Sequence, residues 1–368
     1  MKTKALEGST LLRVVVVGTD PLGNGGVASV LHIYQQGGLD KRVDCRFLVT
    51  HRDGSGRSKL LVFIKALTRL FMWLWEGHGE ILHIHTSSRV SFYRKSVVAL
   101  LGRLWGRKII LHVHSGEFMQ FYHKECGSFA KAYVRLVFSL AHVTIVLANQ
   151  WVPCLKEIVP ENRLRVLHNP ILLPPTPPDP TNRNQNRLLF LGRMGVKKGL
   201  WDLLEVMARL VPGHVDLVLH IGGDGDVDAV RARIQALELT RHVQLEGWLR
   251  GPEKLNLMRS ASIYLLPSYY EGLPMGVLEA MSWGMAVVAS RVGGVEDAIP
   301  HASMGLCIQP GNLDQLEAAL RSLLENPPLR RSMGLAARRH VESTFSCEII
   351  LDQLLTIYRE CFEGSAKR

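Results

Sequence analysis

Short, apolar, β-rich segments alternate with longer helical patterns along the chain, and this alternation limits the possible folds more than any other feature. Six such segments come first, at 11–18, 45–50, 81–86, 108–114, 143–148 and 163–169. Five more follow, at 187–192, 215–223, 243–248, 263–268 and 286–292. Apolar strands that alternate with helices form parallel sheets that are covered on both faces. The sequence therefore predicts an α/β protein with doubly wound parallel sheets.

A proline-rich segment divides the alternation into two halves. Five prolines occur in residues 174–180, and the polar run up to residue 186 contains no apolar side chain, which is typical of a linker. We predict a first domain at 1–172, a linker at 173–186, a second domain at 187–345 and a C-terminal helix at 346–368 that packs back on the first domain. Ligands of open parallel sheets bind beyond the carboxyl ends of the strands. Two such domains facing each other across a cleft would both offer loops to it.

The net charge of +11 is concentrated in one half of the chain. Residues 1–175 carry 23 Lys+Arg against 11 Asp+Glu, whereas residues 176–368 carry 21 against 22. This excess indicates an anionic partner, such as a phospholipid surface, a polyprenyl-phosphate acceptor or a nucleic acid, or else a generally basic surface. No aromatic-interleaved basic motif favours nucleic acid. Six scattered cysteines without a C-x-x-C pair favour a reducing cytoplasm, and no segment reaches the roughly 18 uncharged apolar residues of a membrane span.

Glycines and charges follow several of the predicted strands. Gly25 and Gly26 let backbone N–H groups approach an anion, although a simple tight turn has the same pattern. Arg193 and Lys198 are two cations on one loop, which suit a diphosphate or are merely solvated. The D-x-D pair in GGDGD (222–226) fits a tight turn with a helix N-cap better than a metal site, so we predict no metal.

The segment PSYYEGLPMGVLEAMSWG (267–284) places two carboxylates around a predicted helix start. Pro274 suits the first helical turn, and the exposed N–H groups of Gly272, Leu273 and Met275 would point at a ligand above the helix start. Glu271 lies just before this helix and Glu279 inside it, roughly 7 Å or more away. A nucleotide diphosphate sugar has hydroxyl groups at both ends of a diphosphate of about that length.

The same segment resembles the retaining glycosyltransferases of the GT-B fold, most closely the large bacterial family 4, whose frame is E-G-x-P-x-x-x-x-E. Other motifs of that family fit in chain order: Gly25-Gly26, His114 in HVHSGEF, the G-R-x-x-x-x-K-G loop at 192–199, Gly223 with Gly225 and, imperfectly, Gly293, Gly294, Asp297 and Ile299. The resemblance implies a GT-B fold of two Rossmann-like domains. It also implies transfer of a sugar, most commonly a hexose, from a UDP-, GDP- or ADP-sugar without a cofactor.

Roles follow from this resemblance residue by residue. Arg193 and Lys198 would neutralise the leaving diphosphate, His114 would lie beside the reacting sugar, and Glu271 would bind and position the sugar without acting as a nucleophile. Front-face attack assisted by the leaving phosphate would retain the configuration. The implied donor-binding residues are Gly25, Gly26, Gly223, Gly225, Gly272, Leu273, Pro274, Met275 and Glu279, the last of them on the ribose.

The acceptor is less determined by the sequence. Residues 58–79 form an apolar run with three cations and two tryptophans, which fits an amphipathic helix at a membrane surface or a core helix. With the basic first half, the run favours a peripheral enzyme at the inner face of the plasma membrane. The acceptor would be a lipid-linked or polyprenyl-diphosphate-linked glycan in bacterial envelope or exopolysaccharide synthesis. Residues expected to meet it are His85, Arg89, Arg94 and Lys95, whereas His83, His85 and His112 are also typical of satisfied strand-end histidines.

Other classes of protein remain as alternatives. A sugar-nucleotide epimerase or a phosphorylase has the same GT-B fold, and so would a non-catalytic nucleotide-sugar-binding protein. A dinucleotide-dependent dehydrogenase is the least favoured, because the first loop lacks the G-x-G-x-x-G spacing.

Overall fold

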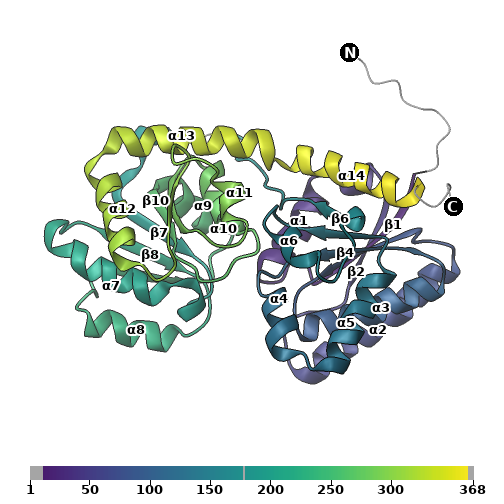
Figure 1. Ribbon diagram of the computed structural model, residues 1–368. Helices are drawn as coiled ribbons and strands as arrows, with labels where there is room; N and C mark the ends of the chain where they lie inside the picture. Colours follow the sequence, from purple (N-terminus) through teal and green to yellow (C-terminus); the bar gives the residue numbers. More distant parts are fainter. Residues whose placement is uncertain (1–10, 177–178, 364–368) are drawn as a thin grey trace, which may run out of the picture. The chain divides into compact units, whose positions relative to one another are not determined.

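The computed structural model describes residues 11–176 and 179–363. Residues 1–10 of the first predicted domain, 177–178 of the predicted linker and 364–368 of the predicted C-terminal helix lie outside the described residues. The chain forms two compact units (Figure 1). The first contains the residues up to Leu147, Trp151–Pro170 and those from Ile350 onward, and the second contains Ala148–Gln150 and Ile171–Ile349.

The first unit is built on a six-stranded parallel sheet in the order β2-β1-β3-β4-β5-β6. Its elements are β1 (Arg13–Gly18), α1 (Gly26–Gln36), β2 (Asp44–Val49), α2 (Gly56–Trp75), β3 (Ile81–Thr86), α3 (Val90–Leu104), β4 (Lys108–Val113), α4 (Phe118–Gln120), α5 (Ser128–Leu140), β5 (Val143–Val146), α6 (Trp151–Leu155), β6 (Leu164–Val166) and most of α14 (Cys347–Glu363).

Strand alternation gives this sheet two different faces. Leu82 and Ile84 of β3 join an apolar core with the buried faces of α2, α3 and α5. His83 and His85 alternate with them, and their contacts are instead to Tyr358 of α14 and Tyr34 of α1. The histidines of β3 therefore occupy the face covered by the first and the last helix.

The second unit repeats the plan with a parallel sheet in the order β12-β11-β10-β7-β8-β9. Its elements are β7 (Asn184–Leu191), α7 (Leu200–Leu210), β8 (Val218–Gly222), α8 (Val227–Ala236), β9 (Val243–Gly247), α9 (Gly251–Ser260), β10 (Ala261–Leu266), α10 (Met275–Ser282), β11 (Ala286–Ser290), α11 (Val295–Ala298), β12 (Leu306–Ile308), α12 (Leu313–Glu325) and α13 (Pro327–Thr344). Strand β10 is buried at every position, as expected for a strand covered on both faces.

All eleven predicted strands are present, with small changes at their ends. Strand β7 starts at Asn184, three residues before the predicted strand, because Asn184 pairs with Ala261 of β10. The short edge strand β12 was not predicted from its three residues. Residues 313–340 have one continuous helical spacing in the sequence, which predicts a single helical segment, but they form two helices. Asn326 ends α12, and its side chain accepts a hydrogen bond from the Leu329 N–H at the start of α13.

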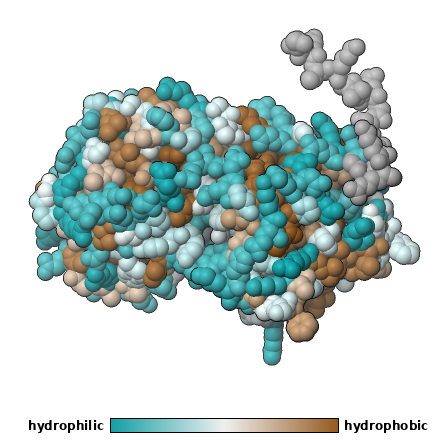
Figure 2. All heavy atoms as spheres, in the orientation of Figure 1, coloured by the Kyte–Doolittle hydropathy of each residue, from teal (hydrophilic) through white to brown (hydrophobic). Residues whose placement is uncertain are grey.

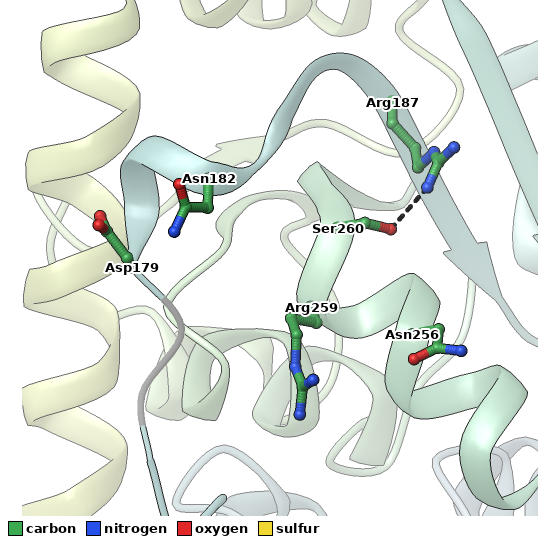
Figure 3. Close-up of a pocket in the computed structure, with 6 residues that line it drawn as sticks. All are labelled: Asp179, Asn182, Arg187, Asn256, Arg259 and Ser260. Atoms are coloured by element: carbon green, nitrogen blue, oxygen red, sulfur yellow. Dashed lines mark hydrogen bonds between the residues drawn. The ribbon is translucent and has the colours of Figure 1, made fainter.

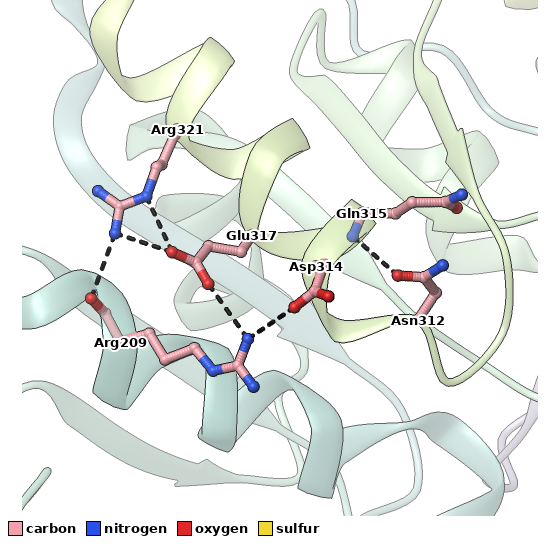
Figure 4. Close-up of polar contacts among 6 residues, drawn as sticks. All are labelled: Arg209, Asn312, Asp314, Gln315, Glu317 and Arg321. Atoms are coloured by element: carbon pink, nitrogen blue, oxygen red, sulfur yellow. Dashed lines mark hydrogen bonds and ion pairs between the residues drawn. The ribbon is translucent and has the colours of Figure 1, made fainter.

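A network of charged groups joins α7 to α12 on the surface of the second unit (Figure 4). Arg209, at the end of α7, forms ion pairs with Asp314 at 3.0 Å and Glu317 at 3.3 Å. Arg321 forms a further ion pair with Glu317 at 2.8 Å. The first two turns of α12 thus place carboxylates beside the last turn of α7, and the positions of Asp314 and Arg209 also suit the dipoles of the two helices.

Among the described residues, no helix is both long enough and apolar enough to cross a membrane.

Candidate active site

The strand order of the second unit places its candidate residues at a topological switch point. Strands β7 and β10 are neighbours, while the chain continues from β7 toward β8 on one side and from β10 toward β11 on the other. Loops diverge above such a point and leave a crevice at the carboxyl ends of the strands. Arg193 and Lys198 follow β7, and Glu271 follows β10, so the predicted residues of both loops meet at this crevice.

Close backbone contacts hold the two loops together. Gly199 has φ 65°, and a Cβ atom there would lie 1.9 Å from the carbonyl oxygen of Pro267. The N–H of Tyr269 donates to the carbonyl of Lys197 at 2.9 Å. A residue other than glycine at position 199 would push the cationic loop away from the segment that carries Glu271.

The loop after β8 adds a third layer to this arrangement. Cβ atoms at Gly223 and Gly225 would lie 1.9 Å and 2.3 Å from the carbonyl oxygens of Gly192 and Met194. Asp226 occupies the N-cap position of α8, as predicted, although its side chain forms no capping hydrogen bond. Both glycines therefore let this loop pack directly on the backbone that precedes and follows Arg193.

Two ion pairs organise the predicted carboxylates. Lys198 Nζ lies 2.6 Å from Glu271 Oε1, which also accepts a hydrogen bond from Ser268 Oγ at 2.7 Å. Lys254 Nζ on α9 lies 2.7 Å from Glu279 Oε1. Arg193 is exposed and forms no ion pair or side-chain hydrogen bond with any residue in 11–176 or 179–363. Its guanidinium is thus available for a ligand, whereas both glutamates are already held by lysines.

The start of α10 lies next to these pairs. Pro274 is its N-cap residue, and the first-turn N–H groups of the helix have no acceptor within it. A Cβ atom at Gly276 would lie 2.1 Å from Tyr264 Oη, which donates to the carbonyl of Leu191 at 3.1 Å. Burial, followed by the charges of the glutamates at 279 and 271, raises the pKa of Tyr264 well above its usual value. Tyr264 therefore remains a neutral hydrogen-bond donor beneath the helix start.

The glycine pair after β11 closes the other side of the E-G-L-P segment. Gly293 has φ 55°, and a Cβ atom there would lie 1.9 Å from the carbonyl oxygen of Glu271. The N–H of Gly294 donates to the carbonyl of Gly272 at 2.5 Å. Asp297, one turn on, accepts hydrogen bonds from the backbone N–H and side-chain amide of Asn149. These contacts give the imperfect G-G-x-x-D match a structural role in holding the loop of Glu271.

The first unit brings four histidines together at the ends of β3 and β4. His85 Nδ1 lies 2.8 Å from His114 Nε2, and His83 Nε2 lies 3.1 Å from His112 Nδ1. Burial lowers the pKa of His114 to about 3 and that of His83 to about 3, so both imidazoles are neutral at pH 7. The prediction of satisfied strand-end histidines is wrong for two atoms, because the buried Nε2 atoms of His85 and His112 have no hydrogen-bond partner among residues 11–176 and 179–363.

Ligand atoms of His83, His85 and His112 lie within 4.8 Å of one another, a spacing that admits a shared metal ion. Their surroundings oppose a cation, however. The positive charge of Lys95 acts on both His85 and His114 and lowers the pKa of each, after the larger effect of burial. A cationic neighbour would raise the free energy of a bound metal ion.

The four residues expected to meet an acceptor differ in their environments. His85 is part of the histidine group described above. Arg89 lies at the N-cap of α3 with φ 57° and forms ion pairs with Glu117 at 2.9 Å and with Glu125. Arg94 and Lys95 form no ion pair or side-chain hydrogen bond within the described part of the chain, and Lys95 is 3% exposed. Arg89 is thus neutralised by the protein, whereas Arg94 and Lys95 are not.

The glycine-rich first loop leads into α1 as predicted. Gly25 is the N-cap residue with φ 104°, and Gly26 is the first residue of the helix. Both are exposed, and a Cβ atom at position 25 would meet nothing within 4 Å. Backbone N–H groups at this helix start are therefore accessible to a ligand.

A surface pocket in the second unit lies elsewhere (Figure 3). It is lined by Asp179, Asn182, Arg187, Asn256, Arg259 and Ser260. These residues surround the start of β7 and the end of α9, so the pocket is at the opposite end of the strands from the loops that carry Arg193 and Glu271.

Several residues of the site were not predicted from the sequence. Lys254 looks like an ordinary surface lysine of a short helix, and nothing in its spacing points to Glu279. Ser268 does lie three residues before Glu271, a local spacing that allows its hydroxyl to reach the carboxylate. Tyr358, whose hydroxyl lies 2.7 Å from His83 Nδ1, comes from 275 residues along the chain and gives no local signal.

Comparison with solved structures defines the class of this fold. Anabaena Alr3699/HepE in complex with UDP superimposes with a TM-score of 0.74 over 95% of this chain and 100% of that chain, at 15% sequence identity. A chain with two such doubly wound parallel α/β units has the GT-B fold. The sequence prediction of that fold is confirmed.

The sequence comparisons then relate part of the chain to known proteins. Residues 177–340, less than half of the chain, match the family described as glycosyl transferases group 1. A glycogen synthase of Mycobacterium tuberculosis is 31% identical over 182 residues, 48% of this chain and 43% of that protein. The GDP-mannose-dependent monoacylated alpha-(1-6)-phosphatidylinositol monomannoside mannosyltransferase of Corynebacterium glutamicum is 30% identical over 172 residues, 45% of each chain. The chain thus matches less than half the length of these curated relatives.

Proposed function

We propose that this protein is a glycosyltransferase that moves a hexosyl group from a nucleotide diphosphate sugar to a glycan acceptor, with retention of the anomeric configuration. The observation that carries the proposal is the switch point of the second unit. There, an unpaired Arg193, the Lys198–Glu271 pair and the start of α10 lie on adjacent loops. UDP in the similar Anabaena structure and GDP-mannose in the name of the Corynebacterium relative support a nucleotide-sugar donor.

The chemistry follows from the charges on these loops. Breaking the bond between sugar and diphosphate leaves negative charge on the leaving group, and Arg193 and Lys198 supply positive charge without a metal. Glu271 is 7% exposed and held by Ser268, so its carboxylate is fixed where the hydroxyl groups of the sugar are expected. Glu279, held by Lys254, is the proposed acceptor of hydrogen bonds from the ribose. His114 and the N–H groups near Gly26 complete the proposed set from the first unit.

A donor panel and a matched pair of variants test this function. Thermal shift with UDP-, GDP- and ADP-sugars identifies the donor, because a ligand present at about 100 times its Kd stabilises a protein by about 2.7 kcal/mol. With that donor, Lys198→Gln is expected to lower kcat by about 10²-fold or more, since it removes charge stabilisation of the leaving group. Lys197→Gln removes the same charge from the neighbouring position and should leave turnover within about twofold. Equal activity of the two variants would show that the site is assigned wrongly.

The acceptor side of the proposal is a lipid-linked or envelope glycan at the inner face of the bacterial plasma membrane, in envelope or exopolysaccharide synthesis. Helix α2 supports it, because large apolar side chains at positions 60, 61, 64, 71, 72 and 75 are exposed, and Trp75 is 78% exposed. Figure 2 shows apolar residues gathered at the lower right, where Figure 1 draws α2. The same helix carries Lys59, Lys65 and Arg69, which suit anionic headgroups.

Vesicle flotation tests this surface. The protein is expected to float with vesicles that contain anionic phospholipid at low salt and to be released at high salt. Trp75→Glu should abolish flotation, whereas Val215→Glu, a similar change at an exposed position of the second unit, should not. If flotation depends neither on anionic lipid nor on the side chain at position 75, the proposed membrane surface of α2 is wrong.

A further inference from the structure

A group of basic side chains in the first unit lies beyond the carboxyl ends of the strands without compensating acids. Lys95, on the second turn of α3, is 3% exposed and has no ion-pair or side-chain hydrogen-bond partner among the described residues. The buried Nε of Arg94, its neighbour, likewise has no hydrogen-bond partner in the described part of the chain. A buried cation without a counter-charge is costly in free energy, so this arrangement favours binding of an anion.

Electrostatic interactions relate His51 to these two cations. Burial is the largest cause that lowers the pKa of His51. The charges of Arg94, Lys59 and Lys95 lower it further, whereas that of Asp53 raises it. Burial, and after it the charge of Arg94, lower the pKa of Lys95 to about 7. Lys95 also acts on His85 and His114. Among the charged groups of the described chain that these interactions name, Asp53 is therefore the only acid.

The topology explains why these side chains converge. In the sheet order β2-β1-β3-β4, the chain leaves β1 toward β2 on one side and leaves β3 toward β4 on the other. His51 follows β2, Lys95 lies on the helix that follows β3, and His114 follows β4. The first unit thus has its own switch point, which is the place in an open parallel sheet where a ligand binds.

The nature of the ligand follows from the charges. Arg89, three residues after β3, is neutralised by Glu117 and Glu125, so it contributes little to an anion site. His51, Arg94 and His114 are only half-buried, which leaves the rim open to solvent. A compact dianion can accept hydrogen bonds from the guanidinium and the ammonium together, and a phosphoryl group is the common biological group of this kind.

We infer that His51, Arg94 and Lys95 form a subsite for a phosphoryl group carried by the acceptor. This inference rests on the proposed function, since it takes the first unit to be the acceptor side of a glycosyltransferase. It assigns the acceptor a phosphate or diphosphate close to the group that receives the sugar. The phosphoryl group of the substrate would then supply the negative counter-charge that Lys95 lacks in the free protein.

Binding measurements test the subsite without any turnover. Isothermal titration calorimetry at fixed ionic strength would compare inorganic phosphate, farnesyl phosphate and UDP on the wild-type protein, Lys95→Met, Arg94→Gln and Lys41→Gln. Lys95→Met keeps the length of the apolar stem and removes a buried unpaired charge, so its melting temperature should not fall. Lys41→Gln makes the same charge change at an exposed position of the same unit.

The expected result is a loss of at least tenfold in affinity for both phosphates in Lys95→Met and Arg94→Gln, with UDP affinity unchanged and Lys41→Gln like the wild type. Equal phosphate affinity in all four proteins would overturn the subsite. A parallel loss of UDP affinity in the two variants would assign these cations to the donor and overturn the acceptor role. Binding of inorganic phosphate without binding of farnesyl phosphate would overturn the acceptor role as well. Absence of sugar transfer with phosphate binding intact would count against the proposed function and leave the subsite in place.

Discussion

Acidification is expected to weaken the first unit through its buried histidines, and His83 shows how. The side chain of His83 is fully buried, with Nδ1 2.7 Å from Tyr358 Oη and Nε2 3.1 Å from His112 Nδ1. The titratable groups that surround it are Tyr358 from α14, His85 and His112 from β3 and β4, and His114. Burial, and after it the charge of His114, lower the pKa of His83 to about 3.

The magnitude follows from the difference in protonation between the folded and unfolded chains. An unfolded histidine takes up a proton near pH 6.5, whereas His83 in the folded protein stays neutral until about pH 3. The stability that its neutral form contributes is therefore complete above pH 6.5 and is lost as the pH falls toward 3. Because pH 5 lies about 1.5 pH units below the pKa of the unfolded residue, the loss there is about 2 kcal/mol.

Hydrogen exchange measures this loss locally. Opening free energies of peptides that cover β3 and β4 would be obtained at pH 7 and pH 5, corrected for intrinsic exchange rates, with peptides of β10 and β11 as an internal reference. His83→Gln keeps a polar partner for Tyr358 but does not titrate, so its loss between pH 7 and pH 5 should be smaller by about 2 kcal/mol. An identical loss in the wild type and in His83→Gln would refute the reasoning.

Three further predictions concern the second unit. Gly199→Ala places a Cβ atom 1.9 Å from a backbone carbonyl and should lower the melting temperature by several degrees, whereas Gly213→Ala, which meets nothing within 4 Å, should change it little. Arg183→Met should lower the free energy of unfolding in urea by about 3 kcal/mol or more, because the buried guanidinium donates to several backbone carbonyls that would lose their partner. Lys254→Met should raise the KM for the donor by about tenfold with a smaller effect on kcat, since it releases Glu279 from its ion pair; an unchanged KM would separate Lys254 from the donor site.

Much of the fold could be predicted because its determinants are local. Buried parallel strands are apolar at nearly every position, so the segment predicted at 263–268 overlaps β10 (Ala261–Leu266) without any knowledge of its neighbours. Glycines such as Gly199 and Gly293 mark close backbone approaches that any side chain would block, and this is why they appear in the loop motifs. The boundary inside 313–340 was missed because both helices continue the same apolar spacing, and only the cap at Asn326 separates them.

The partners of the site residues could not be predicted, because they depend on tertiary contacts. The sequence puts Lys198 and Glu271 in a donor site with separate tasks, one on the diphosphate and one on the sugar. In the structure the two side chains form an ion pair with each other at 2.6 Å. Their meeting depends on β7 and β10 being neighbours in the sheet, and strand order is not encoded in either loop. For the same reason, the sequence does not show that Arg89 differs from Arg94 and Lys95. Only the structure shows that Glu117 and Glu125 form ion pairs with Arg89.

These ion pairs show where part of the excess positive charge of residues 1–175 is left without acidic partners. In the second unit, Lys198 and Lys254 are each balanced by a glutamate at the switch point, and Arg193 remains exposed. At the switch point of the first unit, Arg94 and Lys95 are not balanced, although carboxylates close by are used to neutralise Arg89. A generally basic surface would place its unpaired cations in solvent, where hydration is strong. The burial of Lys95 therefore argues for a specific anion at this point of the fold, because a bound negative charge offsets the cost of keeping an ammonium group there.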